Sequence, residues 1–167
     1  DRYIICDITL RLHKKKKCDV SYSSLQEYLN KNQITNPSLA DLRKAVLNIR
    51  TKKLEKPRHA PNAGSYFKNP IISKKDFKIL SKSYINIPHF DINNKKIKLY
   101  AGWLIEEAGW KGKKCGNAKV SSRNALQIIN RNGKSNTNEI MLLTKNLKRD
   151  IFNKFGVKLE EEVQYIT

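Results

Sequence analysis

The sequence predicts an α+β fold, in which helices and strands follow one another without a regular βαβ rhythm. Two long segments, residues 39–54 and 137–155, repeat apolar residues at helical spacing. Several short runs are rich in β-branched residues or alternate apolar with polar side chains. With 167 residues, of which 39% are hydrophobic, the chain is long enough for one domain plus a piece of another.

In the first third, residues 3–12 are predicted to form a strand, with Ile8, Leu10 and Leu12 on one side. A strand that begins at the first residue leads us to expect that the chain was cut from something longer. Residues 24–29 are predicted to form a short helix. The helix over 39–54 should begin after a capping box of Ser38 and Asp41. Its predicted apolar stripe consists of Leu39, Leu42, Val46 and Ile49.

Residues 55–64 contain Pro and Gly and are predicted to form a loop or hinge. A helix capped by Ser73 should follow, with Phe77 and Leu80 facing inward. Gly156 should end the helix over 137–155. The remaining predicted elements are strands over 96–100, 118–120, 125–129 and 157–166, and a helix over 101–108.

The net charge of +19, from 34 basic and 15 acidic residues, invites a nucleic-acid interpretation. However, 26 of the basic residues are Lys and only 8 are Arg, the residue that base readers and phosphate clamps favour. The dense run Lys14 to Lys17 resembles a solvated hairpin tip. The surplus of Lys, Asn and Ile is typical of an A/T-rich genome, so we expect no nucleic-acid partner. A non-enzymatic basic module that binds nucleic acid or an anionic surface remains the alternative.

Three cysteines and three histidines lack the spacing of a disulfide framework or a metal site, so we expect reduced thiols and no metal. No apolar run approaches the ~20 residues of a membrane span, and residues 1–10 do not resemble a secretory signal. We therefore expect a cytoplasmic protein without a membrane partner.

The string NAGSYFKNP, residues 62–70, gathers a hydroxyl, a cation and an amide behind a small Ala-Gly pair that lets a ligand approach closely. From the residues alone, a turn with a capping Ser65 is the favoured explanation. Glu160 and Glu162 should share one face of the last strand and Glu161 the other, either as an acid or base or as a solvated edge. The cations of residues 50–53 suit a helix C-terminus or a diphosphate.

Five strings stand in the order RTKKLEKP, NAGSYFKNP, KLYAGWLIEEAGWKG, SSRNALQIIN and LEEEVQYI. In this order and spacing they resemble the UDP-N-acetylenolpyruvoylglucosamine reductase family, and the surroundings of Tyr22 resemble its type I branch. The resemblance runs from Asp1 to the end. It implies a cytoplasmic flavin enzyme of peptidoglycan synthesis, in which NADPH reduces FAD. The flavin then passes hydride to the enolpyruvyl C3 of a UDP-sugar, and a protein acid protonates C2.

The resemblance assigns the acid to Ser65 and a supporting role at the same centre to Glu162. It assigns contacts with the substrate diphosphate or sugar to Tyr22, Lys53 and Asn69. Asn124 stands where the family usually has a longer glutamine that contacts the substrate. Glu161 stands where relatives often have proline, which leaves Glu160 as a fallback for Glu162.

The resemblance also divides the chain. It implies that residues 1–54 are the tail of a FAD-binding domain, 55–156 the substrate-binding domain and 157–167 a strand that returns to the FAD-binding region. The glycine-rich FAD segments and an active-site arginine of the family would lie upstream. We then expect a monomer when the protein is complete and a poorly stable, inactive fragment otherwise. A relic that keeps the fold without activity is a third possibility, which Ser65 and Glu162 disfavour.

Overall fold

The computed structural model describes residues 5–12 and 19–166, which fall into two compact units, 1–50 and 51–167. The predicted hairpin tip at Lys14 to Lys17 lies outside the described residues. The first unit contains α1 (Ser23–Lys31) and most of α2 (Leu39–Lys53), which confirms both predicted helices. Its small core consists of Leu25, Leu29 and Ala45.

The predicted capping box at the start of α2 is confirmed. The Asp41 N–H donates to Ser38 Oγ at 3.2 Å, and the Ser38 N–H donates to the Asp41 carboxylate at 3.0 Å. The Ser38 hydroxyl also donates to the Asp41 carboxylate at 2.6 Å, and this bond, followed by the bond from the Ser38 N–H, holds the pKa of Asp41 below its ordinary value. The predicted stripe is wrong in part, because Leu39 and Val46 are exposed. The face that packs is centred on the fully buried Ala45, which shares a core with Leu25 and Leu29 of α1.

The predicted strand over 3–12 is also wrong where it is described. Residues 5–12 form neither helix nor strand, and Ile8, Leu10 and Leu12 are exposed. Alternation states which side chains share a face, but a strand also needs a neighbour that accepts its backbone hydrogen bonds.

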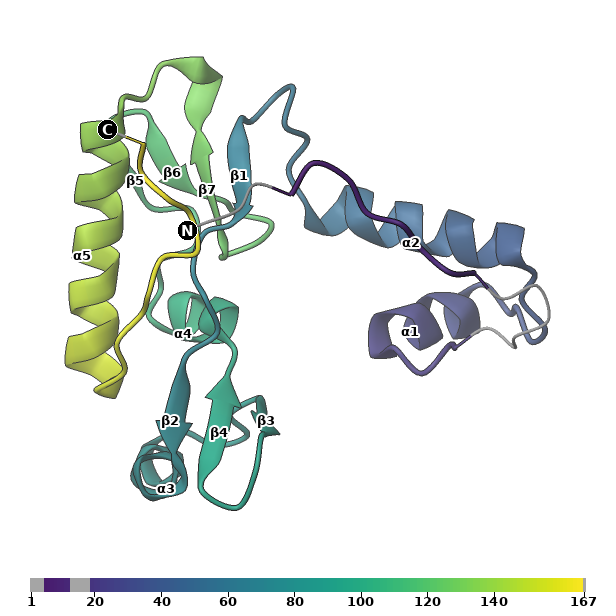
Figure 1. The fold of residues 1–167 in the computed structure, drawn as a ribbon, viewed down its shortest axis with the longest axis horizontal. Helices are drawn as coiled ribbons and strands as arrows, with labels where there is room; N and C mark the ends of the chain where they lie inside the picture. Colours follow the sequence, from purple (N-terminus) through teal and green to yellow (C-terminus); the bar gives the residue numbers. More distant parts are fainter. Residues whose placement is uncertain (1–4, 13–18, 167) are drawn as a thin grey trace. The chain divides into compact units, whose positions relative to one another are not determined.

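The second unit contains two antiparallel sheets, and its mixture of helix and sheet confirms the predicted α+β class (Figure 1). The four-stranded sheet has the order β1-β7-β6-β5 and the three-stranded sheet the order β2-β4-β3. The strands are β1 (Asn62–Ser65), β2 (Ile71–Ser73), β3 (His89–Asp91), β4 (Lys96–Leu99), β5 (Lys114–Cys115), β6 (Ala118–Val120) and β7 (Gln127–Asn130).

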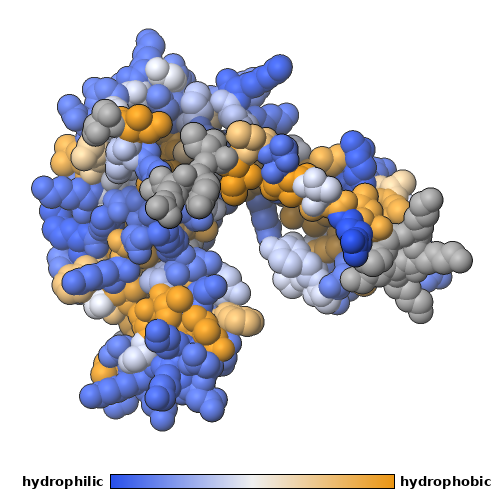
Figure 2. All heavy atoms as spheres, in the orientation of Figure 1, coloured by the Kyte–Doolittle hydropathy of each residue, from blue (hydrophilic) through white to orange (hydrophobic). Residues whose placement is uncertain are grey.

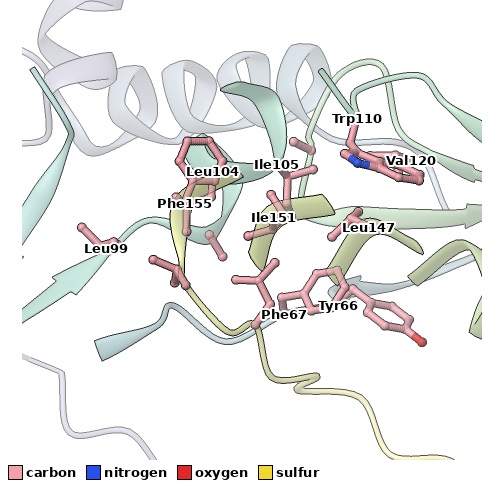
Figure 3. Close-up of a cluster of buried hydrophobic side chains, with 14 of the residues drawn as sticks. Tyr66, Phe67, Leu99, Leu104, Ile105, Trp110, Val120, Leu147, Ile151 and Phe155 are labelled. Carbon is pink, nitrogen blue, oxygen red and sulfur yellow. The ribbon is translucent and has the colours of Figure 1, made fainter. Parts of the chain in front are cut away.

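Three α-helices and a short 3-10 turn complete this unit: α3 (Lys74–Ser83), α4 (Ala101–Glu107), η1 (Arg131–Gly133) and α5 (Thr137–Phe155). Ser73 caps α3 and Gly156, with φ 67°, ends α5, as predicted. In Figure 1, α5 runs along one side of the four-stranded sheet. Leu143, Leu147 and Ile151 of α5 are buried in the same core as Leu99, Leu104 and Val120 (Figure 3).

The clearest differences from the prediction in the second unit concern three segments. The predicted loop over 55–64 gives way to β1 at Asn62, and the strand expected over 125–129 is Gln127–Asn130. Residues 157–166 keep the predicted alternation as far as Val163, but they form one isolated β-bridge rather than a strand. Val157 and Leu159 are buried in the main core, and their burial holds this segment against the rest of the second unit.

The tight turn between β5 and β6 is tied to α5 through Glu139. The Glu139 carboxylate accepts the Asn117 N–H at 3.2 Å. A Cβ added at Gly116, where φ is 57°, would lie 2.1 Å from that carboxylate. An alanine at 116 would therefore hold a strained backbone conformation and would have to displace the Glu139 carboxylate.

Gly116→Ala should lower the free energy of unfolding by about 2–3 kcal/mol. Alanine would be strained in the left-handed backbone conformation of this turn, and the hydrogen bond between Asn117 and Glu139 would be lost. Gly133→Ala is the matched control, because φ is 67° there and a Cβ would meet nothing within 4 Å. It should cost only the strain, about 1 kcal/mol. Urea unfolding measures both. If Gly116→Ala remains the more costly change in a Glu139→Ala background, the contact with Glu139 is not its cause.

Candidate active site

Ser65 ends β1 at a distortion of the sheet. The pairing of β1 with β7 matches Asn62 with Ile129 and Ser65 with Gln127, so the register shifts between them. Asn62 Oδ1 accepts the Gly64 N–H at 3.0 Å, and Gly64 has φ 79°. A Cβ at Gly64 would meet only open space, and Ser65 is exposed. The backbone before the hydroxyl is thus bent, small and accessible to a ligand.

Glu162 is brought to Ser65 by an antiparallel pairing of distant segments. The Lys68 N–H donates to the Glu160 carbonyl at 2.9 Å, and the Glu162 N–H donates to the Tyr66 carbonyl at 2.8 Å. Between these bonds Phe67 and Glu161 form the isolated bridge. An open hollow of about 480 Å³ is lined by Ala63, Ser65, Glu162 and Val163. The hydroxyl and the carboxylate predicted at one centre therefore share one hollow.

The other two glutamates have partners of their own. Glu160 forms an exposed ion pair with Lys68 and, more than Glu162 does, raises the pKa of that lysine. Glu161 accepts two hydrogen bonds from Lys148 of α5, at 2.8 and 2.9 Å. Of the three, Glu162 alone lines the hollow that contains Ser65.

A polar network lies beside Ser65 and is centred on the buried Gln127. Its Oε1 accepts the Glu55 N–H at 3.1 Å, and its Nε2 donates to Asn62 Oδ1 at 3.1 Å. The Glu55 carboxylate in turn accepts the Ser121 hydroxyl at 2.9 Å and lies 3.8 Å from Arg123. The network joins the segment after α2 to β1 and to the loop before β7.

Two predicted substrate-binding residues lie at the ends of this network. Lys53 is the last residue of α2 and is exposed, two residues before the anchored Glu55. Asn124 lies in the loop before β7, where its Oδ1 accepts the Leu126 N–H at 3.0 Å and its N–H donates to Ser121 Oγ at 3.3 Å. Among the described contacts, none joins either of them to Ser65.

Asn69 and Tyr22 have different surroundings. Asn69 Oδ1 accepts the Ala101 N–H at 2.9 Å, so this side chain caps the first turn of α4. Tyr22 is 70% exposed and precedes α1 in the first unit, where its carbonyl accepts the N–H groups of Leu25 and Gln26. The contact of Tyr22 with a substrate stays a prediction.

The outer face of the three-stranded sheet is a feature that the sequence analysis missed. Its register places Ile71, Lys98 and Phe90 in one row across β2, β4 and β3. Ile71 and Phe90 are exposed, and so is Tyr100, which lies between the end of β4 and the start of α4. Figure 2 shows hydrophobic side chains gathered among hydrophilic ones in the lower part of the view, where this sheet lies. Tyr100 adjoins Ala101, the residue that Asn69 caps.

Alternation along 96–100 could have indicated this face, but it cannot identify the neighbouring strands. The aromatic residues Phe77, Trp103 and Tyr165 differ in burial. Phe77 and Trp103 pack against the core, whereas Tyr165 is 40% exposed.

Comparison with known proteins identifies the family. The family described as "UDP-N-acetylenolpyruvoylglucosamine reductase, C-terminal domain" matches residues 56–166, which is most of the chain. The chain belongs to the UDP-N-acetylenolpyruvoylglucosamine reductase family. This confirms the resemblance carried by the five strings, and the matched range contains Ser65, Asn69, Asn124 and Glu162.

Individual members of the reductase family match nearly the whole chain. The chain is 38% identical to the UDP-N-acetylenolpyruvoylglucosamine reductase of Flavobacterium johnsoniae over 99% of its own length and 49% of the relative's. It is 33% identical to that of Bacteroides fragilis over 95% of its length and 47% of the relative's. The chain thus spans about half the length of the curated relatives it matches.

This chain is 21% identical in sequence to the reductase of Thermus caldophilus, whose crystal structure is known. The structural alignment covers 81% of this chain and 36% of the Thermus chain, with a TM-score of 0.44. A likeness this distant adds nothing to the family assignment. Among residues 5–12 and 19–166, no helix is long and apolar enough to cross a membrane. The same residues contain no group of three or more His, Cys, Asp or Glu side chains that could hold a metal ion.

Gln127→Leu should destabilise the second unit by about 2 kcal/mol, because the Glu55 N–H and Asn62 lose their partners in a buried position. Gln26→Leu, at an exposed position of α1, is the control and should change the free energy of unfolding by less than about 0.5 kcal/mol. Urea denaturation followed by circular dichroism checks both. Equal effects would show that the Gln127 network contributes no stability.

Proposed function

We propose that the protein containing this chain reduces UDP-N-acetylglucosamine enolpyruvate to UDP-N-acetylmuramate, with FAD as cofactor and NADPH as reductant. The reaction belongs to peptidoglycan precursor synthesis in the bacterial cytoplasm. One observation carries the proposal: in a member of this reductase family, Ser65 and Glu162 line one hollow although they come from opposite ends of the matched region. Residues 1–54 would be the tail of the FAD-binding domain and 55–156 the substrate-binding domain.

The residues present fit a flavin as one wall of its site. Gly64 leaves open space beside Ser65, so a planar ring could lie against this backbone. The dinucleotide phosphates require glycine-rich backbone or a helix N-terminus, which we assign to the half of the relatives' length that this chain does not span. When bound, the reduced flavin would supply the hydride that adds to C3 of the enolpyruvyl group.

Ser65 would supply the proton that C2 receives. A serine hydroxyl is a very weak acid in water, so this transfer requires a strongly basic carbon and a site from which water is excluded. The hollow is open in the chain alone, and a bound substrate would cover it. Ser65 then holds its proton on Oγ beside the carbon that must receive it.

Glu162 would act on the electronic structure of the same carbon centre. Its carboxylate would polarise the enolpyruvyl group or stabilise the enol-like intermediate as charge develops. Glu160 is a weaker candidate than Glu162, because its carboxylate is engaged by Lys68. Among the described ion pairs, Glu160 and Glu161 each have a lysine partner and Glu162 has none. Glu162 is therefore the residue that we propose at the reacting centre.

The substrate would extend from the hollow along the exposed residues of this unit. Lys53 would neutralise the diphosphate, and the amides of Asn69 and Asn124 would bind the phosphate or sugar oxygens. The outer row of Ile71, Lys98 and Phe90 offers a flat aromatic and apolar surface with a cation, which suits the uridine ring. Tyr22 is proposed as a further substrate contact.

The proposal is tested with the whole reading frame, extended upstream of Asp1 and expressed complete. NADPH oxidation should depend on UDP-N-acetylglucosamine enolpyruvate. Ser65→Ala and Glu162→Gln should each lower kcat by at least about 100-fold, because general acid catalysis typically contributes that much. Reduction of the flavin by NADPH should remain intact in both variants.

Glu160→Gln is the matched control for Glu162→Gln and should keep kcat within about threefold, since surface ion pairs contribute little. A yellow protein that ignores the enolpyruvyl substrate would refute the substrate assignment. A colourless complete protein would instead favour the basic binding module.

Phe90→Ala should raise the KM for the UDP-sugar by roughly 10-fold and leave kcat unchanged, because stacking with a base contributes about 1–3 kcal/mol. Ile79→Ala removes an apolar side chain of comparable exposure on α3 and should change neither constant. Steady-state kinetics at varied substrate measures both. An unchanged KM in Phe90→Ala would exclude the outer face as the nucleotide site.

A further inference from the structure

The segment that carries Glu162 is attached to the rest of the second unit by few backbone bonds. The pairing with residues 66–68 comprises the Lys68–Glu160 and Glu162–Tyr66 hydrogen bonds around one isolated bridge. From 162 to 166 the described chain forms neither helix nor strand. A chemical role for Glu162 needs its carboxylate to be held within a fraction of an ångström, which such a short pairing does not ensure.

Side chains on the α5 side of this segment provide further attachment. Lys148 donates to both oxygens of Glu161, and neither side chain of the pair is fully exposed. The Tyr66 and Tyr165 hydroxyls are hydrogen-bonded to each other. The two links meet the segment at positions 161 and 165, on either side of Glu162.

The segment separates two hollows. Glu161 and Tyr165 line a hollow of about 410 Å³ against α5, together with Thr144 and Lys148. Glu162 and Val163 line the hollow that contains Ser65. Because 161 and 162 point to different hollows, a rotation of the segment that freed Glu161 would also turn Glu162.

Both links are anchored in rigid parts of the unit. Lys148 follows Leu147, which is fully buried in the core, within the 19-residue helix α5. Tyr66 is 5% exposed, and Figure 3 shows its hydroxyl at the edge of the core cluster, directed away from it. Burial, followed by the hydrogen bond shared with Tyr165, raises the pKa of Tyr66 above its ordinary value.

We propose that Lys148, through Glu161, and Tyr66, through Tyr165, are positioning residues that fix the direction of Glu162 toward the hollow of Ser65. The inference rests on the proposed function for the role of Glu162. The ion pair and the hydroxyl pair act on orientation more than on overall stability, since ion pairs at partly exposed positions stabilise folds weakly.

The test uses the complete protein in three variants: Lys148→Met, the charge exchange Lys148→Glu with Glu161→Lys, and Tyr165→Phe. Lys148→Met should lower kcat roughly 10-fold and leave the KM for the UDP-sugar within twofold, because displacement of a reacting group affects the chemical step. The charge exchange should restore kcat, which a purely local loss of packing would not permit. Tyr165→Phe, at a partly exposed position, should lower kcat in the same sense without threatening the fold.

Hydrogen exchange on peptides covering 66–68 and 160–163 gives a readout that is independent of activity. In Lys148→Met these amides should exchange roughly 10-fold faster, and in the charge exchange they should recover. Lys111→Met is the matched control, because it breaks the 2.8 Å ion pair of Lys111 with Glu106 on the surface of α4. It should alter neither exchange nor kinetics.

The positioning role is overturned if hydrogen exchange at both peptides is unchanged in Lys148→Met. It is also overturned if the double variant with Lys148→Glu and Glu161→Lys restores neither kcat nor the slow hydrogen exchange. An unsubstituted protein that does not turn over the enolpyruvyl substrate refutes the proposed function instead. The exchange data then still decide whether Lys148 holds the segment. Normal turnover in Lys148→Met with faster exchange would show that the segment loosens without moving Glu162, and it would also overturn the inference.

Discussion

Tyr66 is the residue at which the backbone of the candidate site changes partner. Its N–H donates to the Leu126 carbonyl beside β7, and its carbonyl accepts the Glu162 N–H from the end of the chain. β1 and the residues after it are therefore bonded on one side to the four-stranded sheet and on the other to the C-terminal segment. Ser65, Glu162 and the Gln127 network all depend on this double attachment, because each is placed by one of its two sides.

The two sides of β1 are held by different kinds of contact. On the Gln127 side, the buried amide bonds the Glu55 N–H through its oxygen and the Asn62 side chain of β1 through its nitrogen. The C-terminal side is shallow and is held largely by side chains from α5 and by Tyr66. The side of β1 that faces Gln127 is thus held by buried polar contacts, whereas the C-terminal segment is held by partly exposed ones.

Local signals in the sequence predicted the elements whose causes are local. The capping box of Ser38 and Asp41, the cap at Ser73 and the stop at Gly156 need no knowledge of tertiary contacts. The apolar periodicity of α5 was equally sufficient. The strand over 3–12, the extent of β7 and the form of residues 157–166 depend on which neighbour pairs with them, and alternation does not contain that information.

The same distinction applies to the site. The string NAGSYFKNP drew attention to Ser65 by composition alone, but the proximity of Glu162 follows from a pairing across nearly the whole second unit. The resemblance to a family supplied that proximity where physical reasoning from the residues could not. The row of Ile71, Lys98 and Phe90 was missed for a related reason, since two of its three members lie on strands that were not predicted.

The strand order β1-β7-β6-β5 has a consequence for the order in which this unit folds. β5, β6 and β7 are neighbours in sequence and can pair through short loops, whereas β1 must close a loop of more than 60 residues, from Ser65 to Gln127, at an entropic cost of about 4 kcal/mol. Local hairpins form sooner than such distant pairs. The strand that carries Ser65 is thus expected to join its sheet late and, in the native protein, to be among the first to open.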